Sequence, residues 1–114
     1  MSNKVDESLV ADIIEAIEKI FLYTAGMDKA AFMASNITVD AVSRNIMIIG
    51  EAASKLSNHY VNTHANVSFH DMKLLRNRFI HGYNWVSSSN VWQTVREQIP
   101  LWEKQITSCA HNNE

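Results

Sequence analysis

The sequence has few of the residues that form tight turns or covalent cross-links. Its 114 residues include three glycines, one proline and one cysteine. Sandwiches and barrels need many turns rich in glycine and proline, so this scarcity favours long helices. The single cysteine, Cys109, excludes a disulfide within the chain and a zinc site built from several cysteines.

Long apolar runs and a strong charge of one sign are also missing. The apolar runs are only a few residues long, and the opening stretch MSNKVDESLV is too polar for a signal peptide. We therefore expect a cytoplasmic protein with no membrane-spanning segment. The net charge of −2 creates no overall field that would attract nucleic acid.

The composition that remains is that of an ordinary globular protein, with 46% hydrophobic and 19% charged residues. A chain of this length predicts a single domain over residues 1–114. Its charge is uneven. Residues 1–40 carry three lysines against seven acidic residues, whereas residues 69–85 carry three basic residues against one acidic residue.

Apolar residues recur at steps of three and four, which predicts an antiparallel, all-α bundle of four main helices and one short helix. The spacing places main helices at about 6–25, from Ser35 or Thr38 onward, at about 69–81 and at about 88–108. A short helix follows at 29–35. Asp28 and Ser87 are suitable N-caps. The stretch NHYVNTHANVS, residues 58–68, is the most loop-like.

Three details of these helices carry further expectations. Gly50 lies inside a helix, where it costs about 1 kcal/mol relative to alanine, and a close approach of another helix would explain its use. Met47 and Ile48 lie off the apolar stripe of that helix, which favours a central position or an oligomer contact. Trp92 and Trp102 follow the core stripe of the last helix.

The stretch RNRFIHGYNW, residues 76–85, holds the candidate chemistry. Gly82 suggests a glycine C-cap that ends the helix at His81. An imidazole can take up and release a proton near neutral pH, and an arginine can stabilise a phosphate as it gains charge. Together they suffice to cleave RNA, because the 2′-hydroxyl supplies the nucleophile and no metal is needed.

The spacing leaves two arginines as candidates for the residue that stabilises the phosphate. At about 100° per residue, Arg78 lies about 60° from His81 around the helix axis, whereas Arg76 lies about 140° away. Geometry within one helix therefore favours Arg78. The plainer interpretation, a helix end with a solvated basic face, also stays open, since clusters of charge usually just face water.

The residues Arg76, His81 and Tyr83 resemble the Arg-x4-His-x-Tyr signature of HEPN ribonuclease toxins. The similarity is specifically to the HepT-like branch of the HEPN/MNT toxin–antitoxin pairs. It covers nearly the whole chain, because three further segments read like the flanking helices of that branch. They are IEKIFLYTAGMDKAAF, DAVSRNIMIIGEAASKLS and NVWQTVREQIPLW.

The resemblance implies an all-α homodimer with its catalytic clefts between the two copies and a metal-independent endoribonuclease activity without a cofactor. His81 would then act as general base or acid, and Arg76 would stabilise the pentacoordinate phosphate. Tyr83 would receive AMP from a nucleotidyltransferase antitoxin, which silences the toxin. Arg78 could contact the RNA backbone, and Asn77 could orient the His81 ring.

Two other hypotheses remain at this point. The bundle could be a non-catalytic interaction or nucleotide-binding module that partners a nucleotidyltransferase, with Met47 and Ile48 in the contact. A weaker hypothesis is a metal site at His59, His64 and His70. Their spacings match no helical ligand pair and no carboxylate or cysteine completes a set, so we expect no metal site.

Overall fold

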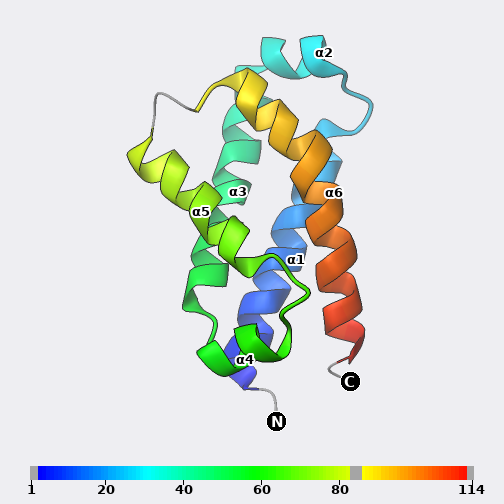
Figure 1. Ribbon diagram of the computed structural model, residues 1–114. Helices are drawn as coiled ribbons and strands as arrows, with labels where there is room; N and C mark the ends of the chain where they lie inside the picture. Colours follow the sequence, from blue (N-terminus) through cyan, green and yellow to red (C-terminus); the bar gives the residue numbers. More distant parts are fainter. Residues whose placement is uncertain (1–2, 83–85, 113–114) are drawn as a thin grey trace.

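The computed structural model describes residues 3–82 and 86–112, with side chains described as far as residue 108. In this part of the chain every element of regular secondary structure is a helix, which confirms the all-α class. The helices are α1 (Lys4–Thr24), α2 (Lys29–Ala34), α3 (Asn36–Lys55), α4 (Asn58–Thr63), α5 (Phe69–His81) and α6 (Ser88–Asn112). Figure 1 shows α1, α3, α5 and α6 running in alternating directions, with α2 and α4 at opposite ends of the bundle.

Short polar side chains begin most of these helices. Asp28 caps α2 by accepting a hydrogen bond from the Ala31 N–H, and Ser35 caps α3 by accepting from the Thr38 N–H. The Ser87 hydroxyl accepts from the Asn90 N–H at the start of α6. These hydrogen bonds confirm Asp28 and Ser87 as N-caps. They also show that α3 begins after Ser35 rather than at Thr38, because the Ser35 side chain satisfies an otherwise unpaired N–H at the start of the helix.

The short helix α4 lies in the stretch expected to be a loop, so the structure adds a second short helix to the one predicted. Ser57 caps it by accepting from the Tyr60 N–H. The Asp6 carboxylate, from the first turn of α1, accepts hydrogen bonds from the Ser57 N–H at 2.9 Å and from its hydroxyl at 2.7 Å. Asp6 is only 4% exposed. This buried carboxylate therefore ties α4 to the start of α1.

The core lies between α1, α3, α5 and α6 and is made of aliphatic side chains with a few aromatic ones. Trp102 is 1% exposed, which confirms its expected core position. Trp92 is only partly buried and packs against the edge of the core, with its ring centroid 5.1 Å from that of Phe32. The most buried aliphatic side chains are Ile13, Ile17, Ile20, Val42, Ile46, Ile49, Met72, Val91, Ile99 and Ile106.

The outer face of α1 is solvated, as the amphipathic pattern predicts. Glu15 and Glu18 are exposed, and the Glu15 carboxylate lies 3.0 Å from the Lys19 ammonium. Its hydrogen bond and its charge raise the pKa of Lys19. Across the described residues, no helix combines the length and the apolar character needed to cross a membrane.

At Gly50, helices α3 and α5 lie so close together that Arg76 packs directly against the glycine. A Cβ atom built on Gly50 would lie 2.2 Å from the Arg76 Cβ and 2.7 Å from the Met72 carbonyl oxygen. Both atoms belong to the backbone or the root of a side chain, so they cannot move without moving α5. The close approach expected at Gly50 is confirmed, and it explains a glycine in the middle of a helix.

We predict that Gly50→Ala destabilises the fold, although alanine is the better helix former by about 1 kcal/mol. The added methyl group forces α3 and α5 apart, and overpacking of this kind costs about 1–3 kcal/mol. Urea unfolding followed by circular dichroism measures the change. Ser54→Ala, one turn further along α3, is the control and should stay within about 0.5 kcal/mol of wild type. A Gly50→Ala protein as stable as wild type would contradict the close packing.

Candidate functional site

Helix α5 divides the candidate residues among different faces. Its buried line is Phe69, Met72 and Leu75, with Phe79 half-buried against the core. At about 100° per residue, Arg76 lies beside this line, whereas His81 lies on the opposite, outward face of the helix. Arg76 is consequently only partly exposed and His81 is exposed.

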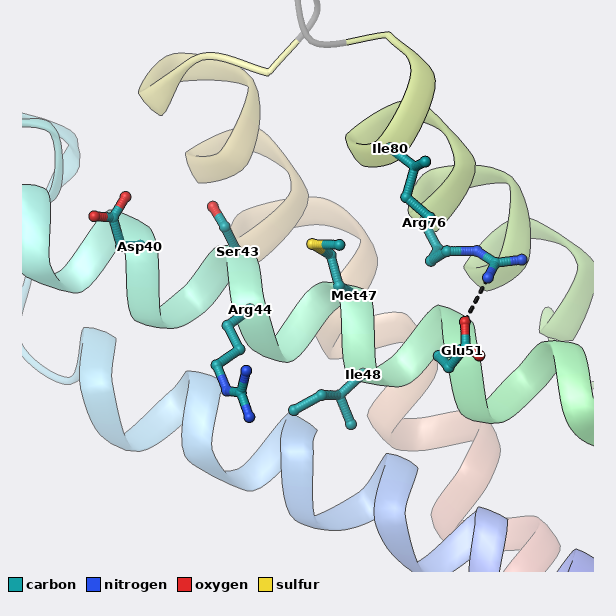
Figure 2. Close-up of a pocket in the computed structure, with 8 residues that line it drawn as sticks. All are labelled: Asp40, Ser43, Arg44, Met47, Ile48, Glu51, Arg76 and Ile80. Atoms are coloured by element: carbon teal, nitrogen blue, oxygen red, sulfur yellow. Dashed lines mark hydrogen bonds and ion pairs between the residues drawn. The ribbon is translucent and has the colours of Figure 1, made fainter.

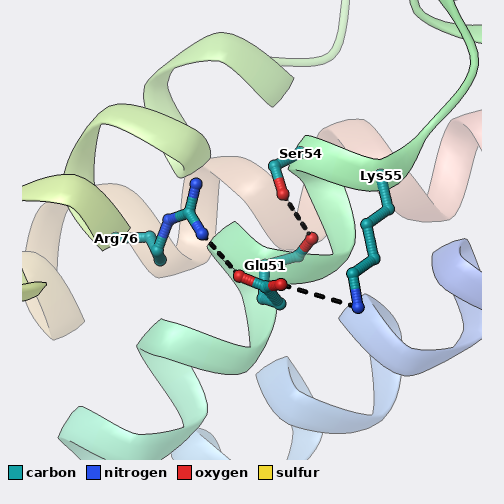
Figure 3. Close-up of polar contacts among 4 residues, drawn as sticks. All are labelled: Glu51, Ser54, Lys55 and Arg76. Carbon is teal, nitrogen blue, oxygen red and sulfur yellow. Dashed lines mark hydrogen bonds and ion pairs between the residues drawn. The ribbon is translucent and has the colours of Figure 1, made fainter.

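Arg76 is held between α3 and α5. Its Cβ lies over Gly50, and its side chain is 17% exposed. Its Nη1 donates a hydrogen bond to Oε2 of Glu51, the residue after Gly50, at 2.5 Å (Figure 3). The second carboxylate oxygen of Glu51 lies 3.5 Å from the Lys55 Nζ. A row of three charged groups, positive, negative and positive, thus runs from α5 along α3.

Arg76 lies at one end of a groove between α3 and α5 with a volume of about 480 Å³. Figure 2 shows its lining. Apolar side chains form the middle of the groove and charged side chains stand at both ends. The residues are Asp40, Ser43, Arg44, Met47, Ile48, Glu51, Arg76 and Ile80. Met47 is 37% exposed and Ile80 is 47% exposed, so the groove wall is open to solvent or to a partner.

His81 is the last residue of α5, as the sequence predicts. The helix ends at Gly82, whose N–H donates to the Arg78 carbonyl at 2.8 Å. Gly82 has a φ of −115°, so the left-handed conformation typical of glycine caps is not used here. Asn77 lies one turn before His81 on the outward half of the helix, and no hydrogen bond joins their side chains in the described structure.

Arg78 lies on the other side of α5 from Arg76. It is exposed and lines a smaller pocket of about 170 Å³ together with residues of α6, among them Asn90, Thr94 and Glu97. The two arginines therefore face different surfaces, and only Arg76 enters the groove beside α3. Tyr83, and Trp85 after it, lie outside the described residues.

Glu51 is the site residue that the sequence pattern did not reveal. Its neighbour Gly50 did give a signal, because a glycine in mid-helix indicates a close approach and the next position then lies at the edge of the contact. Among the residues that the structure describes, no group of three or more histidine, cysteine, aspartate or glutamate side chains could hold a metal ion. His64 instead stacks on Tyr60, with ring centroids 4.0 Å apart.

Comparison with known proteins identifies relatives along most of the chain. A "Probable ribonuclease HepT" from Thermococcus cleftensis is 36% identical over 89 residues, which cover 78% of this chain and 81% of the relative. A "Putative RNase" from Methanocaldococcus jannaschii is 29% identical over 106 residues, covering 93% and 97%. Another "Putative RNase", from Caldanaerobacter subterraneus, is 28% identical over 94 residues, covering 82% and 84%.

No solved structure matches the chain. The model of one protein family, described as "Ribonuclease HepT-like", matches residues 13–109. This match runs from within α1 to within α6 and includes Arg76, His81 and Tyr83. The chain therefore belongs to the HepT-like ribonuclease family.

Proposed function

We propose that this protein is a metal-independent endoribonuclease that acts in the cytoplasm as the toxin of a HEPN/MNT toxin–antitoxin pair. Membership of the HepT-like ribonuclease family supports the reaction class. The observation that carries the proposal is the position of Arg76. This residue lies on α5, the helix that ends in His81, and α3 holds its side chain at the edge of an open groove.

The proposed reaction is cleavage of RNA by its own 2′-hydroxyl. The hydroxyl loses its proton and its oxygen attacks the neighbouring phosphorus, while the bond to the 5′-oxygen breaks and that oxygen gains a proton. His81 moves a proton as general base or acid, since its imidazole is exposed at the end of α5. Arg76 stabilises the charge that builds up on the pentacoordinate phosphate.

This division of roles favours a site made by two copies of the chain. Within one copy, Arg76 turns toward α3 and His81 turns away from it, five residues further along α5. A rise of about 1.5 Å per residue separates their Cα atoms by about 7.5 Å along the axis in addition to the rotation. A second copy packed over Met47, Ile80 and the outward face of α5 would bring an Arg76 and a His81 to one cleft.

The charge of the molecule sets a condition on RNA binding. The whole chain is slightly acidic, so attraction must come from the basic residues near the end of α5, where Lys73, Arg76 and Arg78 outnumber Asp71. Pairing two copies doubles that local charge. Binding that depends on such contacts weakens steeply as the salt concentration rises, because the counterions that the protein displaces from RNA then gain less entropy on release.

The proposed regulation is the transfer of AMP to Tyr83 by a nucleotidyltransferase antitoxin. The phenol oxygen would attack the α-phosphorus of ATP and release pyrophosphate. Tyr83 is two residues after His81, so the added phosphate would bring negative charge beside the catalytic residues. That charge would oppose binding of the RNA phosphate, and the adenosine would obstruct the cleft.

We predict that the purified chain cleaves RNA in the presence of EDTA and that His81→Ala and Arg76→Ala each lower the rate by about 100-fold or more, because proton transfer and charge stabilisation at the phosphate are then lost. Gel electrophoresis of a labelled RNA measures the rate, and mass spectrometry should find 2′,3′-cyclic phosphate ends.

His70→Ala is the control for this experiment, because it removes an exposed histidine from the same helix and should leave cleavage near the wild-type rate. Equal rates for wild type and His81→Ala would overturn the enzymatic proposal. Absence of any cleavage, together with capture of a nucleotidyltransferase, would instead favour the non-catalytic interaction module.

A separate prediction concerns Tyr83. When the chain is incubated with its nucleotidyltransferase partner and ATP, intact-mass spectrometry should show the addition of AMP and the RNA cleavage rate should fall. Tyr83→Phe should remain unmodified and active, since it lacks the phenol oxygen. Addition of AMP to Tyr83→Phe would place the modification at another residue.

A further inference from the structure

Arg76 is buried more deeply than phosphate binding at a protein surface requires. Its stem packs over Gly50, and its Nε is buried and has no hydrogen-bond partner within the described part of the chain. A buried polar group without a partner is unfavourable, so the fold retains this arrangement for a reason other than stability.

The carboxylate of Glu51 fixes the other end of the side chain. It accepts a hydrogen bond from Nη1, and Glu51 itself is 48% exposed. Ion pairs that are half open to water contribute little to stability, because solvent screens them and the side chains lose entropy. The contact of Glu51 with Arg76 is therefore better explained by where it places the guanidinium than by the energy it adds.

From this geometry we propose that Glu51 is a positioning residue of the ribonuclease centre. It holds Nη1 of Arg76, so that Nη2, which has no partner in the described structure, faces the phosphate in a fixed direction. Glu51 touches neither RNA nor the reacting atoms. This inference rests on the proposed ribonuclease function and adds to it the residue that orients the arginine.

The charges around Glu51 are compatible with this role. A lone carboxylate beside the site would repel the RNA phosphate. Here Glu51 lies between the cations of Arg76 and Lys55, and the three groups together carry one net positive charge. The cluster therefore still attracts a phosphate while the guanidinium is kept from rotating, and a rigid arginine loses less entropy when the phosphate gains charge.

The test is the steady-state cleavage of a defined RNA by Glu51→Ala and Glu51→Gln. We expect Glu51→Ala to lower kcat by roughly tenfold, with a smaller change in KM, because misplacement of the arginine weakens the transition state more than the bound substrate. Glu51→Gln should recover part of this loss, since the amide oxygen can still accept from Nη1.

Ser54→Ala is the matched control, because its hydroxyl donates only to the backbone carbonyl of Glu51, away from Arg76, and its loss should keep kcat near wild type. Urea unfolding should show equal stability for all these variants. Arginine side-chain NMR gives a second readout. The Arg76 Nη–H signals should be separate in wild type, where Glu51 holds Nη1 and slows rotation of the guanidinium, and should average in Glu51→Ala.

The failures of the two proposals can be told apart. If His81→Ala cleaves RNA as fast as wild type, the proposed ribonuclease function itself is overturned. If cleavage depends on His81 but Glu51→Ala keeps the wild-type kcat, or if its Arg76 Nη–H signals stay separate as in wild type, Glu51 does not position the arginine. A faster enzyme in Glu51→Ala would show that Glu51 competes with the phosphate, and this would also overturn the inference.

Discussion

The close contact of α3 with α5 at Gly50 is the constraint on which the candidate site depends. A glycine is required there because any side chain would collide with the Arg76 Cβ and with the Met72 carbonyl. The contact brings the end of α3 near enough for Glu51 to reach the guanidinium. The close approach of the α3 and α5 backbones therefore determines how deeply the Arg76 side chain is buried, which way it points and how the groove beside it is shaped. The rest of the bundle supports this approach through the shared core.

The same contact explains why one copy of the chain does not bring the two catalytic candidates together. Burying Arg76 against α3 turns His81 outward, because the two residues lie about 140° apart around α5. The groove that contains Arg76 also exposes Met47 and Ile80. Apolar groups beside a charged site fit an interface with a polar rim better than a surface that stays in water. Dimerisation and catalysis are thus linked in the proposed function.

The sequence predicted the fold well because the features that specify it are local and periodic. Three- and four-residue steps marked the four long helices. Ser35 and Ser87 marked the starts of α3 and α6, and Asp28 marked the start of the short α2. The helix α4 escaped notice because six residues are too few for a periodic signal and its support, Asp6, lies 51 residues away. The pairing of Glu51 with Arg76 spans 25 residues, so it depends on tertiary packing in the same way.

The sequence predicted the candidate site only in part. Angular spacing within one helix favoured Arg78, yet Arg78 faces α6 and Arg76 enters the groove. Spacing along a helix says which residues share a face but not which face meets another helix. The family signature selected Arg76 instead. Only the partial burial of Arg76 against Gly50 supplies a physical reason for that choice.

The central claim is that a complete catalytic centre needs two copies of the chain. It is tested most directly by a dilution series in which the dimer fraction, from analytical ultracentrifugation, and the RNA cleavage rate per chain are measured together. An Ile80→Glu variant, which places a charge on the exposed wall of the groove, extends the series toward the monomer. We predict that the rate per chain rises and falls with the dimer fraction. A monomer that cleaves RNA at the full rate per chain would contradict the account.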